Sequence, residues 1–227
     1  MTLNDIEKVN ILTTDGRKIA GNFYSVPNPR GWLLLAHMMP ATKESWDNFA
    51  KSMQESGYAS LAIDLRGHGK SSGGPDGYKS FTDAMHQASI YDLDAGWDFL
   101  KLRGAVPEKT ALIGASIGAN LALQFIAERN YGVGKAVFLS AGADYRGIET
   151  GPLAGKLKNN QSVIFVTSKD DDDNAKENKV LYDLAPKDMN KHLITYDNGG
   201  HGTDILQSAE YDLKGSILKF LENGSIK

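Results

Sequence analysis

The sequence predicts a single α/β domain built on a mainly parallel twisted sheet with helices on both faces. Three observations predict it. The chain has 227 residues, 41% hydrophobic and 23% charged, so it is long enough for one sizeable core and short for two. Short apolar runs alternate with segments of helical periodicity, which is typical of parallel α/β sheets. The first two runs flank Asp15-Gly16, a strong hairpin signal. We therefore expect one domain over residues 1–227 that opens with an antiparallel hairpin.

The apolar runs are the expected strands. They cover Ile6–Leu12, Lys18–Tyr24, Trp32–Ala36, Ala59–Ile63, Thr110–Ile113, Ala136–Leu139, Val163–Val166 and Leu193–Tyr196. Helices are expected where apolar residues recur every three to four positions, and three of them are followed by a glycine stop. These helices cover Glu44–Ser56, Phe81–Leu102, Ile117–Arg129, Ala175–Leu184 and Thr203–Leu221.

Composition excludes several classes of partner. The net charge is −3, with 25 basic and 28 acidic side chains spread along the chain, so nucleic acid and anionic membrane surfaces are not expected partners. No run approaches the roughly 18 apolar residues of a membrane span, and the opening MTLNDIEKVN lacks a secretory apolar segment. We expect a cytoplasmic protein. The absence of cysteine excludes disulfides, thiolate metal sites and a cysteine nucleophile.

The segment TALIGASIGANLA, residues 110–122, places Ser116 between Gly114 and Gly118 where an expected strand meets an expected helix. G-x-S-x-G is a weak motif alone, but this strand-turn-helix context is the one in which it mounts a nucleophile. The glycines permit the tight turn, and the helix N-terminus directs free N–H groups at an oxyanion. A glycine-rich phosphate turn or a plain loop is the alternative. Ser140 also ends a strand but lacks this turn.

A serine nucleophile needs a base, and five histidines are available. His86 lies inside an expected helix and His192 begins a strand, so structural roles are expected for both. His37 and His68 could line a site, but both precede the serine. His201 follows the last strand on a Gly-Gly loop, from which it can reach over the sheet edge. His201 is the predicted base.

The acid that orients the histidine is expected among the four aspartates 170–173, directly after the Val163–Val166 strand. One carboxylate can turn inward while the others face water and cap the next helix at Asp173 or Asn174. A calcium site is disfavoured because the D-x-D-x-D-G spacing is missing. Asp144 is a minor rival.

With serine, aspartate and histidine in this chain order on a parallel sheet, the sequence resembles the α/β-hydrolase superfamily over almost its whole length. GASIGA, AIDLRGHGKS and NGGHGTDIL carry the resemblance. The region from LLLAHMMP to AIDLRGHGKS is similar to small serine hydrolases of the esterase and dienelactone-hydrolase-like branches. Two features depart from the pattern: His37-Met38 replaces the usual His-Gly, and only residues 144–160 stand where many relatives insert a lid. The resemblance therefore implies an open site with a minimal lid or none.

The resemblance also implies roles for individual residues. Ser116 is the implied nucleophile, His201 the base and Asp171 the acid, with Asp170 second, because Ser168 stands for the glycine of the family's Gly-x-x-Asp. The implied oxyanion donors are the backbone N–H groups of Ile117 and Met39, or less readily Met38, since Pro40 has no N–H. His37 and Met38 are expected to line the substrate pocket.

The expected function is that of a carboxylesterase cleaving small or short-chain acyl esters through an acyl-enzyme, since position 116 is neither the aspartate nor the cysteine of other branches. No metal or organic cofactor is required. The expected partner is a small-molecule ester, and the expected state is a monomer or homodimer. Three alternatives stay open: a thioesterase, an amidase or peptidase with the same residues, and a ligand-binding module that has lost hydrolysis.

Overall fold

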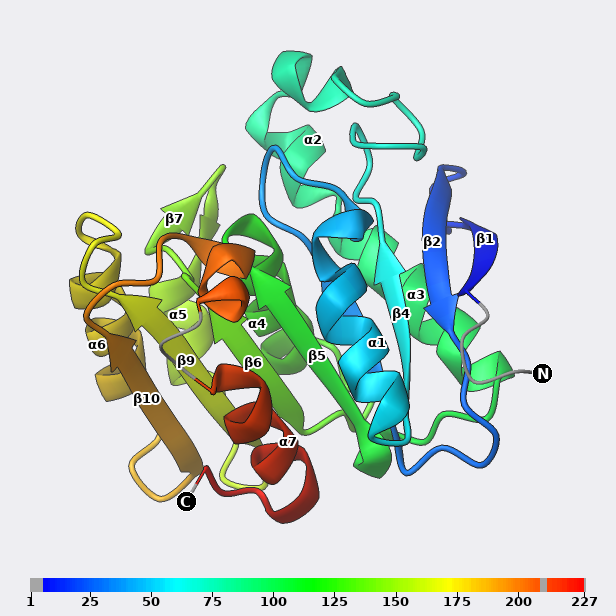
Figure 1. Cartoon of the computed structure of the whole chain (residues 1–227). Helices are drawn as coiled ribbons and strands as arrows, with labels where there is room; N and C mark the ends of the chain where they lie inside the picture. Colours follow the sequence, from blue (N-terminus) through cyan, green and yellow to red (C-terminus); the bar gives the residue numbers. More distant parts are fainter. Residues whose placement is uncertain (1–5, 209–211, 227) are drawn as a thin grey trace.

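A computed structural model describes residues 6–208 and 212–226. Its centre is an eight-stranded sheet in the order β1-β2-β4-β3-β5-β6-β9-β10 (Figure 1). β1 is antiparallel to β2 and β2 to β4, whereas all other neighbours are parallel. The strands of this sheet are β1 Ile6–Leu12, β2 Lys18–Tyr24, β3 Gly31–Ala36, β4 Tyr58–Ile63, β5 Thr110–Ala115, β6 Lys135–Leu139, β9 Ser162–Ser168 and β10 Asn190–Tyr196.

Helices follow most of the strands, and a small two-stranded hairpin stands apart from the main sheet. The hairpin pairs β7 Asp144–Tyr145 with β8 Ile148–Glu149 and projects past the carboxyl ends of the strands (Figure 1). The α-helices are α1 Asp47–Glu55, α2 Asp83–Gln87, α3 Ile90–Leu102, α4 Ile117–Glu128, α5 Thr150–Gly155, α6 Asn174–Leu184 and α7 Leu213–Asn223. The 3₁₀ turns are η1 Lys43–Trp46, η2 Gly77–Ser80, η3 Pro107–Lys109 and η4 Gly202–Gln207.

The sheet separates two apolar layers, as the alternation of side chains along a strand requires. Leu34 of β3 points into the layer formed with α3 to α6, and its neighbour Leu35 points into the layer formed with α1 and α7. Figure 1 shows α1 and α7 on the near face and α3 to α6 on the far face. Both faces of the central strands are thus covered, which explains why these strands are continuous apolar runs in the sequence.

The expected strands are confirmed, and the opening hairpin has the predicted bounds. Six strands are longer than their apolar runs. β10 gains Asn190 to His192, for example, because these polar residues continue the parallel ladder to β9. Hydrogen bonding to a neighbour, which periodicity does not detect, extended the strand.

Three expected helices are wrong in extent. Glu44–Ser56 begins within the 3₁₀ turn η1, and α1 starts only at Asp47. Phe81–Leu102 is divided into α2 and α3, since α2 is capped by Thr82 and buries His86, whereas α3 buries Trp97 against the sheet. Thr203–Leu221 is also divided: η4 ends at Gln207, and α7 begins anew where the Asp212 carboxylate accepts the N–H of Gly215. Residues 209–211 of that expected helix, like residues 1–5 of the opening segment, lie outside the described residues.

Asp64 holds the loops that follow β3 and β4. Its buried carboxylate accepts the backbone N–H of Lys43 at 2.9 Å, the Lys43 ammonium at 2.7 Å and the backbone N–H of Lys70 at 2.9 Å. Gly69 packs against this carboxylate so closely that a Cβ there would lie 2.2 Å from Oδ2. Both loops are therefore fixed at the carboxyl edge of the sheet, where ligands of parallel sheets collect.

Candidate active site

Ser116 occupies a strained turn between β5 and α4. Its φ of 53° and ψ of −120° are in a region that residues other than glycine rarely adopt. Its backbone N–H is held by the carbonyl of Leu139 at the end of β6, at 2.8 Å. The strain is the signature of a nucleophile elbow, and it presents the serine at the start of a helix.

The two glycines of the motif are required by close packing. A Cβ on Gly114 would lie 2.1 Å from the carbonyl oxygen of Gly118, and one on Gly118 would lie 2.4 Å from the carbonyl oxygen of Ala36. The second contact brings the first turn of α4 against the end of β3. As a result, Ile117 lies beside the loop that contains Met38 and Met39, the segment expected to supply the second oxyanion donor.

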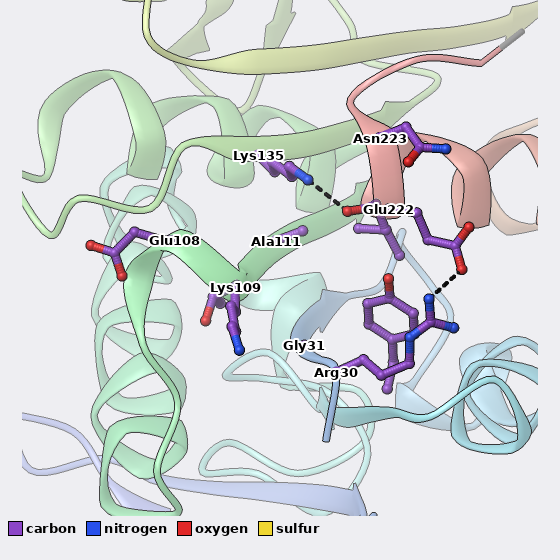
Figure 2. A pocket seen from close by; sticks show the side chains of 11 residues that line it. Arg30, Gly31, Glu108, Lys109, Ala111, Lys135, Glu222 and Asn223 are labelled. Carbon is purple, nitrogen blue, oxygen red and sulfur yellow. Dashed lines mark hydrogen bonds and ion pairs between the residues drawn. The ribbon is translucent and has the colours of Figure 1, made fainter. Parts of the chain in front are cut away.

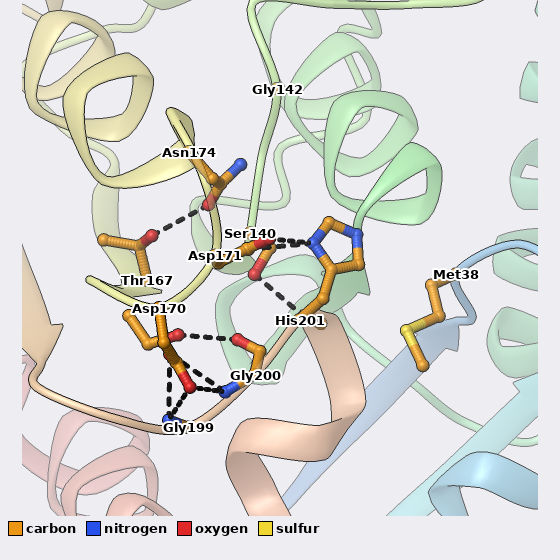
Figure 3. Close-up of polar contacts among 12 residues, drawn as sticks. Met38, Ser140, Gly142, Thr167, Asp170, Asp171, Asn174, Gly199, Gly200 and His201 are labelled. Atoms are coloured by element: carbon orange, nitrogen blue, oxygen red, sulfur yellow. Dashed lines mark hydrogen bonds and ion pairs between the residues drawn. The ribbon is translucent and has the colours of Figure 1, made fainter.

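His201 and Asp171 form a direct pair. His201 Nδ1 lies 2.9 Å and 2.8 Å from the two carboxylate oxygens of Asp171 (Figure 3). The Asp171 side chain is 13% exposed and that of His201 33%, so the carboxylate is mostly withdrawn from water and the imidazole is accessible. The loop carrying His201 lies beside the elbow, since a Cβ on Gly202 would come within 3.4 Å of the Ala115 side chain.

Three further side chains clamp the backbone on either side of His201. Asp170 accepts the N–H groups of Gly199 and Gly200 at 3.1 to 3.2 Å, and Ser168 Oγ donates to the Gly200 carbonyl at 2.6 Å. On the other side, Ser140 Oγ accepts the N–H of Gly202 at 2.9 Å (Figure 3). The adjacent Ser168 hydroxyl and the two glycine N–H groups hold the pKa of Asp170 below its usual value. Of the four aspartates, Asp171 thus binds the His201 imidazole, and Asp170 binds the backbone of the loop that carries it.

Met38 packs against the residues that follow His201. Its sulfur is the nearest atom, at 2.6 Å, to a Cβ placed on Gly202, and it lies 3.8 Å from Thr203 Oγ1. Met38 and Met39 are both partly buried, and Figure 3 shows Met38 on the side of His201 away from Asp171. The two methionines therefore offer apolar surface at the edge of the site.

His37 has a different position from the one expected. It is fully buried, Nδ1 lies 2.8 Å from the Met38 carbonyl oxygen, and Nε2 accepts the N–H of Leu65 at 3.0 Å. Its ring packs edge-on against His68 at 4.9 Å between centroids. Both ring nitrogens are occupied by the backbone, so His37 shapes the loop from behind and presents no surface to a substrate.

Burial of His37 predicts a loss of stability in acid. Burial, with a smaller effect of His68, lowers the pKa of His37 from 6.5 to about 4. Between these values the unfolded chain binds a proton that the folded protein excludes, so stability falls as the pH falls from 6.5 towards 4. Lys43 opposes protonation of the ring, and Asp64 favours it. We expect His37 to account for about 2 kcal/mol of the stability lost between pH 7 and pH 5.

Urea unfolding of wild type and His37→Gln at both pH values measures this contribution. Gln can still donate and accept one hydrogen bond but does not titrate, so the variant should lose less stability between pH 7 and pH 5. Equal losses in the two proteins would contradict the prediction.

The remaining candidates are structural. Asp144 is exposed and its carboxylate accepts the N–H of Gly147 within the β7–β8 turn, which removes it as a rival acid. His68 stacks on Tyr78 at 4.4 Å, His86 packs against Phe81, and His192 packs against Phe220. Among residues 6–208 and 212–226, no group of three or more histidine and acidic side chains is arranged to hold a metal ion.

A separate cavity of about 390 Å³ opens at the opposite, amino-terminal edge of the sheet (Figure 2). Two of its charged side chains bind one another, and a third binds a backbone carbonyl. Arg30 bonds Glu222 at 2.7 Å, and Lys135 donates to the Leu221 carbonyl at 2.6 Å. This polar cavity takes no part in the site around Ser116.

Sequence analysis did not identify one side chain that borders Ser116. Tyr145, on the β7–β8 hairpin, packs edge-on against the His201 ring at 6.4 Å, and its hydroxyl contacts the Ser116 side chain. Its place in the loop after β6, at the same sheet edge as the serine and histidine, was the available signal.

The strand order, the elbow and the order of serine, aspartate and histidine define a hydrolase of the α/β-hydrolase superfamily, which confirms the expected fold class. More closely, the chain belongs to the family described as serine aminopeptidase, S33, whose profile matches residues 27–191. That match includes Ser116 and Asp171 and ends before His201.

The chain is also similar to individual proteins of known name or structure. The chain is 34% identical over 134 residues to a non-heme chloroperoxidase from Streptomyces lividans, covering 58% of this chain and 44% of that protein. It therefore spans less than half of that relative's length. An esterase from Pyrococcus furiosus superimposes with a TM-score of 0.74 and 21% identity, covering 96% of this chain and 90% of its own. An esterase from Exiguobacterium antarcticum superimposes with a TM-score of 0.75 and 13% identity, covering 96% of this chain and 100% of its own. These two structures support the fold.

One further observation concerns membranes. Over the described residues, no helix has both the length and the apolar character needed to cross a bilayer.

Proposed function

We propose that this protein is a serine carboxylesterase that cleaves small or short-chain acyl esters through an acyl-enzyme. The observation that carries the proposal is the strained Ser116 at the head of α4, beside a loop on which His201 is paired with Asp171. Strain at a residue other than glycine is retained only where surrounding structure enforces it, and it clusters at active sites.

Each group has a defined part in the reaction. Ser116 Oγ attacks the ester carbonyl carbon while His201 Nε2 takes its proton, and Asp171 holds Nδ1–H and stabilises the imidazolium. The backbone N–H groups of Ile117 and Met39 stabilise the oxyanion. The tetrahedral intermediate then breaks down to the acyl-enzyme and expels the alcohol, which receives the proton from His201. In the second half-reaction water gives a proton to His201 and attacks the acyl carbon, and the carboxylic acid is released from Ser116. The reaction needs no metal or organic cofactor.

The small hairpin and α5 are the only elements between β6 and β9, which supports a small acyl group bound at an open site. We propose a small-molecule ester as the partner and a monomer or homodimer as the working state.

An amide or short peptide is the second candidate substrate, and the family description favours it. The chemistry at serine is the same for esters, thioesters and amides, so the site geometry serves all three. Turnover of p-nitrophenyl acetate to decanoate, an acyl thioester and aminoacyl p-nitroanilides should be compared side by side. We expect the short esters to have the highest kcat/KM. A higher value for the anilides would make the protein a peptidase, and a higher value for the thioester would make it a thioesterase.

Labelling with a fluorophosphonate probe tests the nucleophile itself. We expect one adduct per chain, and peptide mapping should place it on Ser116 and leave Ser140 unmodified. A chain that is inert towards all these substrates and takes no probe would overturn the proposal in favour of a ligand-binding module.

A further inference from the structure

Among the described residues, Tyr145 is an aromatic side chain that borders the site: its ring packs edge-on against His201, with 6.4 Å between centroids, and its hydroxyl lies beside the Ser116 side chain. It lies on the β7–β8 hairpin, where Arg146 and Gly147 both have positive φ, 57° and 76°. Two central residues of this kind form the tight turn that suits a two-residue hairpin. The turn directs the Tyr145 ring back over Gly142, where a Cβ would lie 2.5 Å from the ring.

The hairpin is held at both ends. At its base, Asn120 of α4 donates to the carbonyls of Gly142 and Ile148 and accepts the N–H of Gly142, at 3.0 to 3.1 Å. At its tip, Gln87 of α2 donates to the Arg146 carbonyl at 3.2 Å. Tyr145 is therefore a fixed part of the site, and the helix that carries Ser116 also carries the residue that anchors the hairpin.

The surrounding hydrogen bonds set the direction in which the Tyr145 hydroxyl donates. The hydroxyl also contacts the Asn174 side chain. Asn174 Oδ1 already accepts from Thr167 at 2.8 Å and from Asn178 at 2.9 Å, and its Nδ2 donates to the Ala141 carbonyl at 3.0 Å. An amide nitrogen has a second hydrogen, which is available for the tyrosine oxygen. The tyrosine proton is then left for Ser116.

Tyr145 also remains a donor across the working range of pH. Burial raises the pKa of its hydroxyl above the usual value of 10, so the phenol keeps its proton near neutrality.

We propose that Tyr145 is a fourth catalytic residue, whose hydroxyl donates a hydrogen bond to Ser116 Oγ and promotes breakdown of the acyl-enzyme. The inference rests on the proposed function, because it concerns the same serine. In deacylation, water loses a proton to His201 and attacks the acyl carbon. The bond from that carbon to Oγ then breaks, its electron pair goes to Oγ, and His201 returns the proton to Oγ. Tyr145 stabilises the negative charge that develops on Oγ and keeps its own proton throughout.

The same hydrogen bond has a smaller effect on acylation. In acylation Oγ is the attacking atom. A hydrogen bond from Tyr145 makes Oγ less nucleophilic, but it also helps the Ser116 hydroxyl to lose its proton, so the two effects oppose one another. Removal of the donor should therefore slow deacylation more than acylation, which distinguishes this role from a purely structural one.

Tyr145→Phe, which keeps the ring, tests the inference with p-nitrophenyl acetate. We expect kcat to fall about 10- to 100-fold, the size of effect that follows loss of one charge-stabilising donor. KM should fall with it, so that kcat/KM changes much less. Acetyl-enzyme should accumulate, seen as a burst of p-nitrophenol and as an acetylated chain by intact mass spectrometry. The rate of fluorophosphonate labelling should stay within a few-fold of wild type.

Tyr131→Phe is the matched control, since its hydroxyl faces Asp94 and not the site; its kinetics should equal those of wild type. Thermal melts of both variants report the fold. A Tyr145→Phe enzyme with unchanged kcat, or with acylation and deacylation slowed equally, would overturn this inference and leave the esterase proposal standing. A wild type that neither turns over esters nor takes the probe would overturn both.

Discussion

Asp171→Asn is expected to lower kcat/KM for p-nitrophenyl acetate by about 10³- to 10⁴-fold. The carboxylate accepts the Nδ1–H of His201 and so leaves Nε2 free to take the serine proton. An asparagine can instead offer its amide hydrogen to Nδ1. The imidazole would then carry its proton on Nε2, where it cannot act as a base.

The neighbouring aspartates are the controls for this substitution. Asp172→Asn should leave kcat/KM within about twofold, because that side chain is exposed and its φ of 41° is one that asparagine adopts readily. Asp170→Asn should lower kcat/KM by about tenfold or less, since an amide oxygen can still accept the N–H groups of Gly199 and Gly200. A larger loss in Asp170→Asn than in Asp171→Asn would reverse the assignment of the acid. Circular dichroism should confirm that all three variants are folded.

These aspartates also illustrate what the sequence could and could not specify. The position of the run after a strand predicts that an acid reaches the site, because carboxyl ends of parallel strands share one edge. The choice between Asp170 and Asp171 depends on a turn in which the N–H of Asp171 bonds the Ser168 carbonyl and Asp172 takes a positive φ. Side-chain direction in such a turn is set by individual dihedral angles, which spacing does not encode.

The fold was more predictable than the site because it rests on periodicity. Apolar runs identified every strand of the main sheet, and the G-x-S-x-G context identified the elbow. Helix breaks were less visible, since the break between α2 and α3 falls at Ala88 and Ser89, where the sequence has neither glycine nor proline. The loop after β6 indicated the sheet edge on which Tyr145 lies, but its place beside Ser116 depends on hydrogen bonds that Gln87 and Asn120, distant in the sequence, donate to the hairpin. His37 is the converse case, as its place at a strand end suggested exposure and the packing buried it.

Arg66→Met is expected to lower the free energy of unfolding by about 3–5 kcal/mol, the usual cost of removing one partner from a buried ion pair. Arg66 is almost fully buried, and its guanidinium bonds Asp92 at 2.7 and 2.9 Å and Asp15 at 2.7 and 3.0 Å. Asp92 has no exposed surface. Without the guanidinium this carboxylate keeps only the backbone N–H of residue 66 as a partner, and the turn of the opening hairpin loses its anchor to the loop after β4.

Arg103→Met is the matched control, because Arg103 also binds a carboxylate through two nitrogens, Glu7 at 2.6 and 2.8 Å. The Arg103 side chain is 37% exposed and that of Glu7 43%, so water already solvates both ions. We therefore expect the substitution to lower the free energy of unfolding by less than about 1 kcal/mol. The Arg103 guanidinium also lies over the Phe99 and Phe23 rings, 4.6 and 5.0 Å from their centroids, and a methionine sulfur can replace part of that contact with the aromatic rings. Urea unfolding followed by tryptophan fluorescence measures both variants. Equal costs would show that burial of Asp92 does not decide the outcome.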